Sequence, residues 1–330
     1  MNLWRKRTIW LSLSAVTTDT GLPPMVHLRH NFPMTEPVAR ARARLLPFHR
    51  RRDPDQLPAP GSLIHLDFEG PLTPSYPHGY ICYCGAVDAG SGLMRLLPCH
   101  SPSKETSQRC LELLLADLRM YMGLTHKLIP HVVATDQGTQ FMSHFFRDFL
   151  SAEQVRHWPA TIYTPQQNAL VERMWGTRFG MARVFLKAAN LGPALHPFAI
   201  QTANWVLNRL PQPSRGNMSP IFILSKRPAS LAYLRLFGSL ARVTLPWPKR
   251  SGDRHFADRG AMGVYLGPSE LSPGSVIYLP KTRQFLVSRD IIVYEDLQPD
   301  TPMGCRLQPR VLHRRENLDA APCPRDRRSP

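Results

Sequence analysis

Hydrophobic residues in the stretch 61–190 occur first in short runs and later at the spacing of helices. Three runs, at 62–68, 80–87 and 92–97, are separated by turns that contain Gly or Pro. Short apolar runs bounded by such turns are typical of β-strands. We therefore expect three consecutive strands at the start of this stretch.

Beyond residue 100 the apolar positions recur every three or four residues, as they do on one face of a helix. Ser101 or Ser103 can cap a first helix. Four leucines mark its apolar face: Leu111, Leu114, Leu115 and Leu118. A second helix is expected at 141–150, between short strands at 131–135 and 155–158.

The longest helical stripe follows Pro165 and consists of Leu170, Met174, Met181 and Phe185. The elements then follow the order strand, strand, strand, helix, strand, helix, strand, helix. This order predicts an α/β fold with a mixed five-stranded sheet flanked by helices. Residues 191–230 continue as helices, and we assign them to the same domain, 61–230.

Outside this domain the pattern changes. Short β-rich runs at 241–245, 262–266, 275–279 and 284–294 alternate with Gly and Pro turns, which predicts a small, β-barrel-like domain over 231–297. Residues 298–330 are rich in Pro and Arg and poor in apolar residues, so we expect a disordered basic tail. Residues 1–60 are irregular and basic.

The composition changes this picture through charge. The 330 residues include 41 Lys and Arg against 24 Asp and Glu, a formal net charge of +17. Such an excess favours a polyanionic partner, with nucleic acid first and an anionic membrane surface second. No apolar run reaches the roughly 18 residues of a spanning helix, so we expect no membrane span. Six scattered cysteines indicate free, buried thiols.

Three acidic residues lie where the predicted elements could bring them together. Asp67 ends the first strand, Asp136 follows the fourth, and Glu172 lies in the first turns of the long helix, with 35 residues between the last two. Three ionised carboxylates repel one another unless a cation lies between them. Oxygen ligands of this kind suit Mg²⁺ or Mn²⁺, and metal pairs about 3.5–4 Å apart are common in phosphoryl transfer.

Each acid also has an ordinary interpretation. Asp136 can form a turn before Gly138, and Glu172 can be a solvated helix residue. Asp88, at the end of the second strand, fits a β-turn better than a place in the site. Cys82 and Cys84 lack further ligands at metal spacing, and we interpret them as core thiols.

Three segments around these acids resemble the catalytic motifs of copia-type retrotransposon integrases. They read LDFEGP at 66–71, TDQGTQF at 135–141 and YTPQQNALVERM at 163–174. Five more segments follow in the family's order: AR at 182–183, NRLP at 208–211, LRLFG at 234–238, GVYLG at 263–267 and SRD at 288–290. The resemblance covers roughly residues 60–297.

The resemblance implies an RNase H-like core in which Asp67, Asp136 and Glu172 bind Mg²⁺ or Mn²⁺ and catalyse the reaction. That reaction trims the 3′ ends of element DNA and joins them to target DNA. Residues before and within the long helix are candidates for contacts with DNA: Gln166, Gln167, Asn168, Arg173, Arg178 and Arg183. Arginines on a helix surface are solvated without contacting DNA about as often as they bind it.

The N-terminal segment departs from the family. Copia-type integrases usually begin with a zinc-binding domain that has two histidines and two cysteines. The matching positions here hold Arg5, Trp10, Thr35 and Val38. His27 and His30 lie nearby without a thiolate partner. These residues are not usual zinc ligands, so we expect no zinc and interpret residues 1–60 as a degenerate remnant.

The sequence therefore predicts a retrotransposon integrase, a fragment of a Pol polyprotein, with DNA as its partner and RNA as a second candidate. If it is active, we expect a homo-multimer, and the implied function places it in the nucleus. Two alternatives stay open: a catalytically inactive, element-derived nucleic-acid-binding protein, and a scaffold protein whose basic tails bind RNA or other partners.

Overall fold

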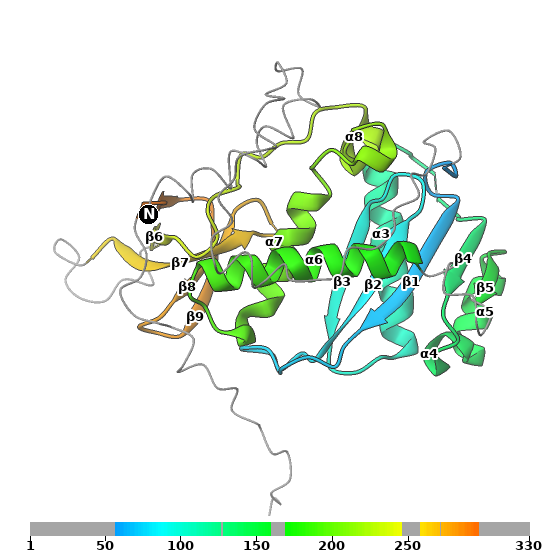
Figure 1. Ribbon diagram of the computed structural model, residues 1–330, viewed down its shortest axis with the longest axis horizontal. Coiled ribbons are helices and arrows are strands. Elements are labelled where there is room, and N and C mark those ends of the chain that lie inside the picture. Colours follow the sequence, from blue (N-terminus) through cyan, green and yellow to red (C-terminus); the bar gives the residue numbers. More distant parts are fainter. Residues whose placement is uncertain (1–56, 127, 160–168, 246–257, 271, 297–330) are drawn as a thin grey trace, which may run out of the picture.

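The computed structural model describes residues 57–126, 128–159, 169–245, 258–270 and 272–296. Within these ranges the chain forms two five-stranded sheets, one in the core and one in the C-terminal region (Figure 1). None of the described helices combines the length and the apolar composition that crossing a membrane requires. Most of the segment 1–60 and the whole of the tail 298–330 lie outside the described residues.

The core sheet has the order β3-β2-β1-β4-β5. Its strands are β1 (Leu63–Glu69), β2 (Cys82–Asp88), β3 (Met94–Cys99), β4 (Val132–Thr135) and β5 (Arg156–Pro159). The first three pair antiparallel, because short connections join them, and β4 and β5 run parallel to β1 after helical crossovers. The predicted fold class is confirmed: the sheet is mixed, helices flank it, and the arrangement is RNase H-like.

Helix α3 (Lys104–Met122) covers one face of this sheet. Of the two predicted caps, Ser103 is the one used, since its side chain accepts a hydrogen bond from the Thr106 amide. Gly123 ends the helix at φ 66°, a left-handed conformation that favours glycine. Alternate strand residues such as Ile64 and Leu66 pack against this helix.

The helix expected at 141–150 is wrong in one respect, because the structure has two helices there. These are α4 (Thr139–Met142) and α5 (His144–Ala152). Ser143, with extended backbone angles, separates them and caps α5 by accepting a hydrogen bond from the Phe146 amide. A serine favours caps over helix interiors, and this preference outweighs the apolar stripe.

The opposite face of the sheet is covered by α6 (Ala169–Ala188) and α7 (His196–Leu207), which pack against each other (Figure 1). The short helices η3 (Pro193–Leu195), η4 (Pro213–Arg215) and α8 (Pro220–Ser225) complete the described helical part. They confirm the expectation of helices over 191–230, and α8 packs against α3.

The second sheet has the order β10-β6-β7-β8-β9 and is antiparallel. Its strands are β6 (Leu240–Thr244), β7 (Gly260–Pro268), β8 (Ser275–Leu279), β9 (Gln284–Ser288) and β10 (Ile291–Tyr294). The single run predicted at 284–294 is thus two strands. Since β9 and β10 stand at the two ends of this order, the described strands form an open sheet. Residues 246–257 and 271 of the predicted barrel-like domain lie outside the described residues.

The second sheet packs on the core through α7 and β7. The Thr202 hydroxyl donates a hydrogen bond to the Leu266 carbonyl at 3.1 Å. Gly267, at φ 111°, lies so close to Thr202 that a side chain at this position would collide with it. The C-terminal sheet is therefore fixed against the helix that also supports α6.

Candidate active site

The first two predicted acids, Asp67 and Asp136, lie side by side at the carboxyl ends of two neighbouring strands of the core sheet. Strands β1 and β4 pair in parallel, with His65 opposite Ala134. Two residues further along, the same register brings Asp67 next to Asp136. Because side chains alternate along a strand, Asp67 points away from Leu66, which faces α3, and towards the α6 side.

Asp136 is held by its own loop. Its Oδ1 atom accepts a hydrogen bond from the Gly138 amide at 2.9 Å, and a side chain at position 138 would meet this oxygen. The Thr135 hydroxyl donates to the Asp136 carbonyl at 2.8 Å and also lies 2.9 Å from His157 Nε2. These hydrogen bonds hold the backbone around Asp136 in place.

Glu172 reaches the site from the first turn of α6 and is exposed. Trp175, three residues later, is buried against Gly85, where a methyl group would come within 2.5 Å of the indole ring. Gly85 is the cross-strand partner of Asp67. The contact of Trp175 with Gly85 thus sets how close the start of α6 lies to Asp67.

These acids influence one another. The pKa of Asp67 is raised to about 7, first by burial and then by the charge of Asp136, with smaller contributions from Glu69 and Glu172. Burial, followed by the charge of Glu172, also raises the pKa of Glu69. A cation bound between these side chains would lower the pKa of both Asp67 and Glu69, because it favours the ionised carboxylates.

Glu69 was missed by the sequence interpretation, although a signal was present. It stands two residues after Asp67 on the same strand, and residues two apart share one face. Its interaction with Glu172 makes it a fourth member of the acid cluster, which we define as Asp67, Glu69, Asp136 and Glu172.

The acid cluster fits a divalent ion by its chemistry but is not a closed ligand set. Among the described residues, no three His, Cys, Asp or Glu side chains lie close enough together to hold a metal ion. The donors are nevertheless carboxylate oxygens, which hard divalent cations prefer. The raised pKa of Asp67 indicates that its charge is only partly compensated, because the backbone hydrogen bond of Phe68 lowers the pKa by less than burial and Asp136 raise it.

The predicted DNA contacts fall into three groups. Gln166, Gln167 and Asn168 lie outside the described residues. Arg173 and Arg183 are exposed on α6, where we expected them. Arg178 is 2% exposed, and the expectation that it faces DNA is therefore corrected.

Arg178 instead joins two helices inside the core. Its Nε donates to Asn204 Oδ1 at 2.7 Å and its Nη2 to Asn208 Oδ1 at 3.4 Å. Both asparagines, on or next to α7, donate in turn to the Met94 carbonyl on β3. The helical stripe could not reveal this role, because it gives no account of polar partners contributed by α7.

Asp88, Cys82 and Cys84 have the structural roles that the sequence predicted for them. The Asp88 carboxylate accepts hydrogen bonds from the Gly61 amide and from Ser91, which confirms its turn role. Cys82 and Cys84 are buried free thiols, as expected for core residues. Cys82 Sγ lies 3.1 Å from Cys99 Sγ on the neighbouring strand.

No protein-family model matches the chain. Curated relatives include the Pol polyproteins of transposon TNT 1-94 from Nicotiana tabacum, 26% identical over 161 residues, and of transposon RE1 from Arabidopsis thaliana, 25% identical over 183 residues. These matches cover 49% and 56% of this chain, and 12% of each polyprotein. The Pro-Pol polyprotein of simian foamy virus type 1 is 32% identical over 109 residues, which are 33% of this chain and 8% of that protein.

Similar solved structures include the following two. The catalytic core domain of HTLV-2 integrase in complex with magnesium, in its trimeric form, is 21% identical with a TM-score of 0.38; the match covers 50% of this chain and 97% of that one. The simian T-cell lymphotropic virus intasome, in complex with a PP2A regulatory subunit, is 17% identical with a TM-score of 0.42 over 74% and 80% of the two chains. The sequence relatives confirm the resemblance that the motifs indicated.

Proposed function

We propose that this chain, a relative of the retrotransposon Pol polyproteins, is an integrase that cuts and joins DNA strands with the help of divalent metal ions. It spans at most 12% of the length of these three relatives, so the other activities of a Pol polyprotein are not part of this proposal. The observation that carries it is the proximity of Asp67 and Asp136 beyond the paired residues of β1 and β4, where the charge of Asp136 helps to raise the pKa of Asp67.

The burial of Asp67 among other acids supports a metal-dependent site. A carboxylate with a pKa of about 7 is costly to ionise, and a purely structural role would not require it. Mg²⁺ or Mn²⁺ held by Asp67, Asp136 and Glu172 would supply Lewis-acid stabilisation of the phosphoryl oxygens. Glu69 is a further oxygen donor within the same cluster.

The residues of the chain contribute rigidity and placement. Strands β1 and β4 hold Asp67 and Asp136 on a fixed backbone, and the Gly138 amide orients one Asp136 oxygen. Glu172 arrives on a helix whose distance from the sheet depends on Trp175. In the proposed reaction, water or a DNA 3′ hydroxyl attacks phosphorus, a new P–O bond forms, and the bond to the leaving oxygen breaks.

A second candidate function is nucleic-acid binding without catalysis. It is favoured by one observation, namely that the described carboxylates do not form a closed ligand set. Both functions share DNA as a partner, for which the net charge of +17 is the support. For the integrase we also propose a homo-multimer and action in the nucleus.

A nicking assay separates the two candidates. Full-length protein is incubated with supercoiled plasmid in Mg²⁺, Mn²⁺ or EDTA, and the variants Asp136→Asn and Glu172→Gln are compared with wild type. Asp148→Asn is the matched control, because Asp148 is an exposed acid on α5, outside the acid cluster. The integrase proposal expects divalent-dependent nicking by wild type and Asp148→Asn alone, whereas equal nicking by all variants would overturn it.

A further inference from the structure

A cavity of about 240 Å³ lies beside α6, outside the acid cluster. Helix α6 contributes Phe179, Leu186 and two basic residues, Arg183 and Lys187, while Leu72 belongs to the loop that follows β1. Most of the lining is apolar. The two basic side chains are exposed, so the cavity combines an apolar interior with positive charge at its mouth.

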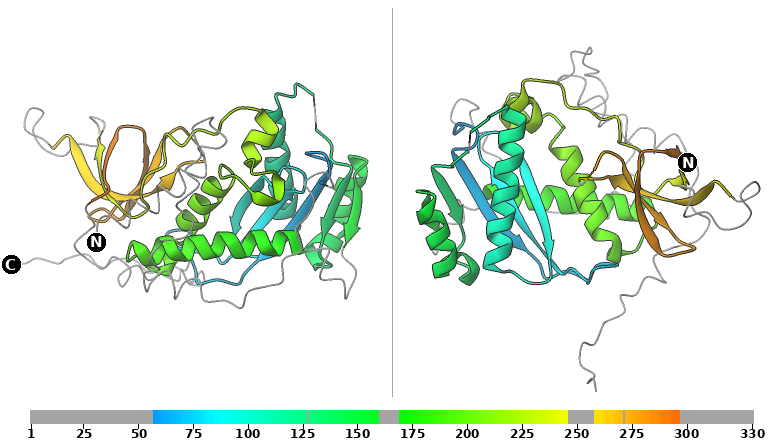
Figure 2. Two further views of the ribbon diagram at one scale, coloured as in Figure 1. Left: turned by 45° about the horizontal axis from the view of Figure 1, so that its top comes forward. Right: turned by 180° about the vertical axis from the view of Figure 1, so that it is seen from behind.

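The walls of the cavity are held by hydrogen bonds. His196 lies between two partners: its Nε2 is 2.9 Å from the Thr73 carbonyl, and its Nδ1 is 2.6 Å from the Tyr83 hydroxyl. The Tyr76 amide donates to the Ala194 carbonyl at 2.8 Å. These bonds fix the loop after β1 against η3 and α7, and Figure 2 shows this loop running along α6.

The cavity shares a helix face with the acid cluster. Arg183 follows Glu172 by eleven residues, which is close to three full turns, so both side chains leave α6 in nearly the same direction. The separation along the axis is about 16 Å at a rise of about 1.5 Å per residue. A DNA strand with a rise of about 3.4 Å per nucleotide covers this distance in about five nucleotides.

The chemistry of the cavity matches a nucleotide. A base needs an apolar, partly aromatic surface, which Phe179 and its apolar neighbours offer. The attached phosphate needs cations, and Arg183 and Lys187 are neighbours because they stand four residues apart on one helix. An uncharged apolar group would make no use of these two cations.

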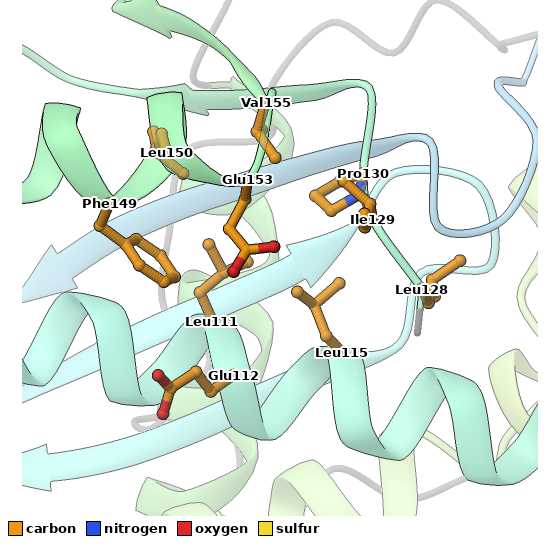
Figure 3. A pocket seen from close by; sticks show the side chains of 10 residues that line it. All are labelled: Leu111, Glu112, Leu115, Leu128, Ile129, Pro130, Phe149, Leu150, Glu153 and Val155. Carbon is orange, nitrogen blue, oxygen red and sulfur yellow. The ribbon is translucent and has the colours of Figure 1, made fainter. Parts of the chain in front are cut away.

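A second cavity shows the contrast (Figure 3). It measures about 160 Å³, lies between α3 and α5, and is lined by apolar residues together with Glu112 and Glu153. Carboxylates repel phosphate, so this cavity does not suit the same ligand. Of these two cavities, the one beside α6 combines an apolar interior with basic side chains.

We propose that the cavity beside α6 is a nucleotide subsite that takes one unstacked base of the DNA strand bound at the acid cluster. Arg183 and Lys187 hold the phosphate of this nucleotide, and the base lies against Phe179. The subsite rests on the proposed function and extends it, because it fixes where the bound strand runs: from the acid cluster along α6 towards η3.

Photo-crosslinking tests this subsite without knowledge of the DNA register. Full-length protein is bound to duplex DNA in which 5-iodouracil replaces every thymine, the complex is irradiated, and the crosslinked peptides are identified by mass spectrometry. We expect a crosslink in the peptide that contains Phe179. Thr73→Trp, which fills the cavity from its exposed rim, should lower this crosslink about tenfold, the order of one lost base–aromatic contact.

Paired variants identify the role of charge. Arg183→Gln combined with Lys187→Gln should weaken the same crosslink and lower the salt dependence of binding by about one or two phosphate contacts. The matched control is Arg109→Gln combined with Arg119→Gln. Both of these arginines are exposed on α3, on the other side of the sheet, and their loss should leave the Phe179 crosslink unchanged.

The outcomes separate the subsite from the proposed function. Crosslinks at Phe179 that Thr73→Trp removes support the subsite, even if the protein does not nick DNA. Nicking by a protein whose crosslinks map elsewhere, or are insensitive to Thr73→Trp, overturns the subsite and leaves the integrase proposal intact.

Discussion

Asp67 is both buried and surrounded by other acids, and these two properties together raise its pKa to about 7. A catalytic or metal-binding carboxylate commonly shows such a perturbation. At the scale of single residues, the most informative quantities are therefore the ionisation of this side chain and the hydrogen bonds of the buried arginine on α6.

Stability without divalent metal should fall as the pH rises from about 4 to about 7. In this window the folded protein keeps the Asp67 proton while the unfolded chain, with a pKa near 3.9, has lost it, so folding becomes less favourable. Three pKa units correspond to at most about 4 kcal/mol. Urea unfolding in EDTA measures this slope, and Asp67→Asn should flatten it. An equal slope in both proteins would contradict the assignment.

Arg178→Met should destabilise the fold by about 1–3 kcal/mol, because it leaves the Asn204 oxygen buried without its donor, whereas the Asn208 oxygen keeps the Met94 amide. Arg183→Met, on the exposed face of the same helix, should change stability by less than about 0.5 kcal/mol. Denaturant unfolding of both variants checks this contrast. If the two variants lost similar amounts of stability, the buried hydrogen bonds of Arg178 would not contribute to the stability of the fold in the way proposed.

At the scale of elements, the contact between Trp175 and Gly85 of β2 helps to set the position of α6, which also packs against α7. Gly85→Val would force the indole away from the sheet, and overpacking of this kind costs about 1–3 kcal/mol. We expect lower stability and a larger loss of nicking than the destabilisation explains, because Glu172 moves with the helix.

Trp175→Leu in the Gly85→Val background is the matching control. The smaller side chain makes room for valine, so the double variant should recover stability and part of the nicking activity. A thermal unfolding series with all three variants measures the coupling. Additive losses would show that the two positions act independently.

The sequence predicted the elements of the core well, because their signals are local. Alternation, Gly and Pro turns and the cap at Ser103 suffice to locate the strands and α3. The two errors arise where a polar residue interrupts an apolar run: Ser143 divides one expected helix, and Arg289 with Asp290 separates β9 from β10.

Part of the candidate site was also predictable, because its signals are local as well. Asp67 and Asp136 follow from strand ends, and Glu172 from its motif. The burial of Arg178 depends on asparagines 26 and 30 residues away, and the cavity beside α6 needs three separate segments. Such tertiary contacts leave no periodic signal along the chain.

At the scale of the whole molecule, the positive charge predicts binding that weakens steeply with salt. Phosphate contacts release counterions, so the logarithm of affinity should fall linearly with the logarithm of salt concentration, by about 0.9 per contact. The tail 298–330, outside the described residues, carries seven arginines: Arg306, Arg310, Arg314, Arg315, Arg325, Arg327 and Arg328.

Deleting residues 298–330 should reduce this salt slope while leaving the fold intact, because the described sheets lie outside this segment. Fluorescence anisotropy with a labelled duplex, at several salt concentrations, measures the slope for both proteins. A slope that the deletion leaves unchanged would show that these arginines do not touch DNA.

The central claim is that the acid cluster transfers DNA strands, and a strand-transfer assay tests it most directly. A labelled duplex with a recessed 3′ hydroxyl is incubated with the full-length protein, a plasmid target and Mg²⁺ or Mn²⁺, and joined products are counted by sequencing. We predict divalent-dependent joining that Asp67→Asn, Asp136→Asn and Glu172→Gln each abolish and Asp148→Asn retains. Joining that survives the loss of Asp67 or Asp136 would contradict the account.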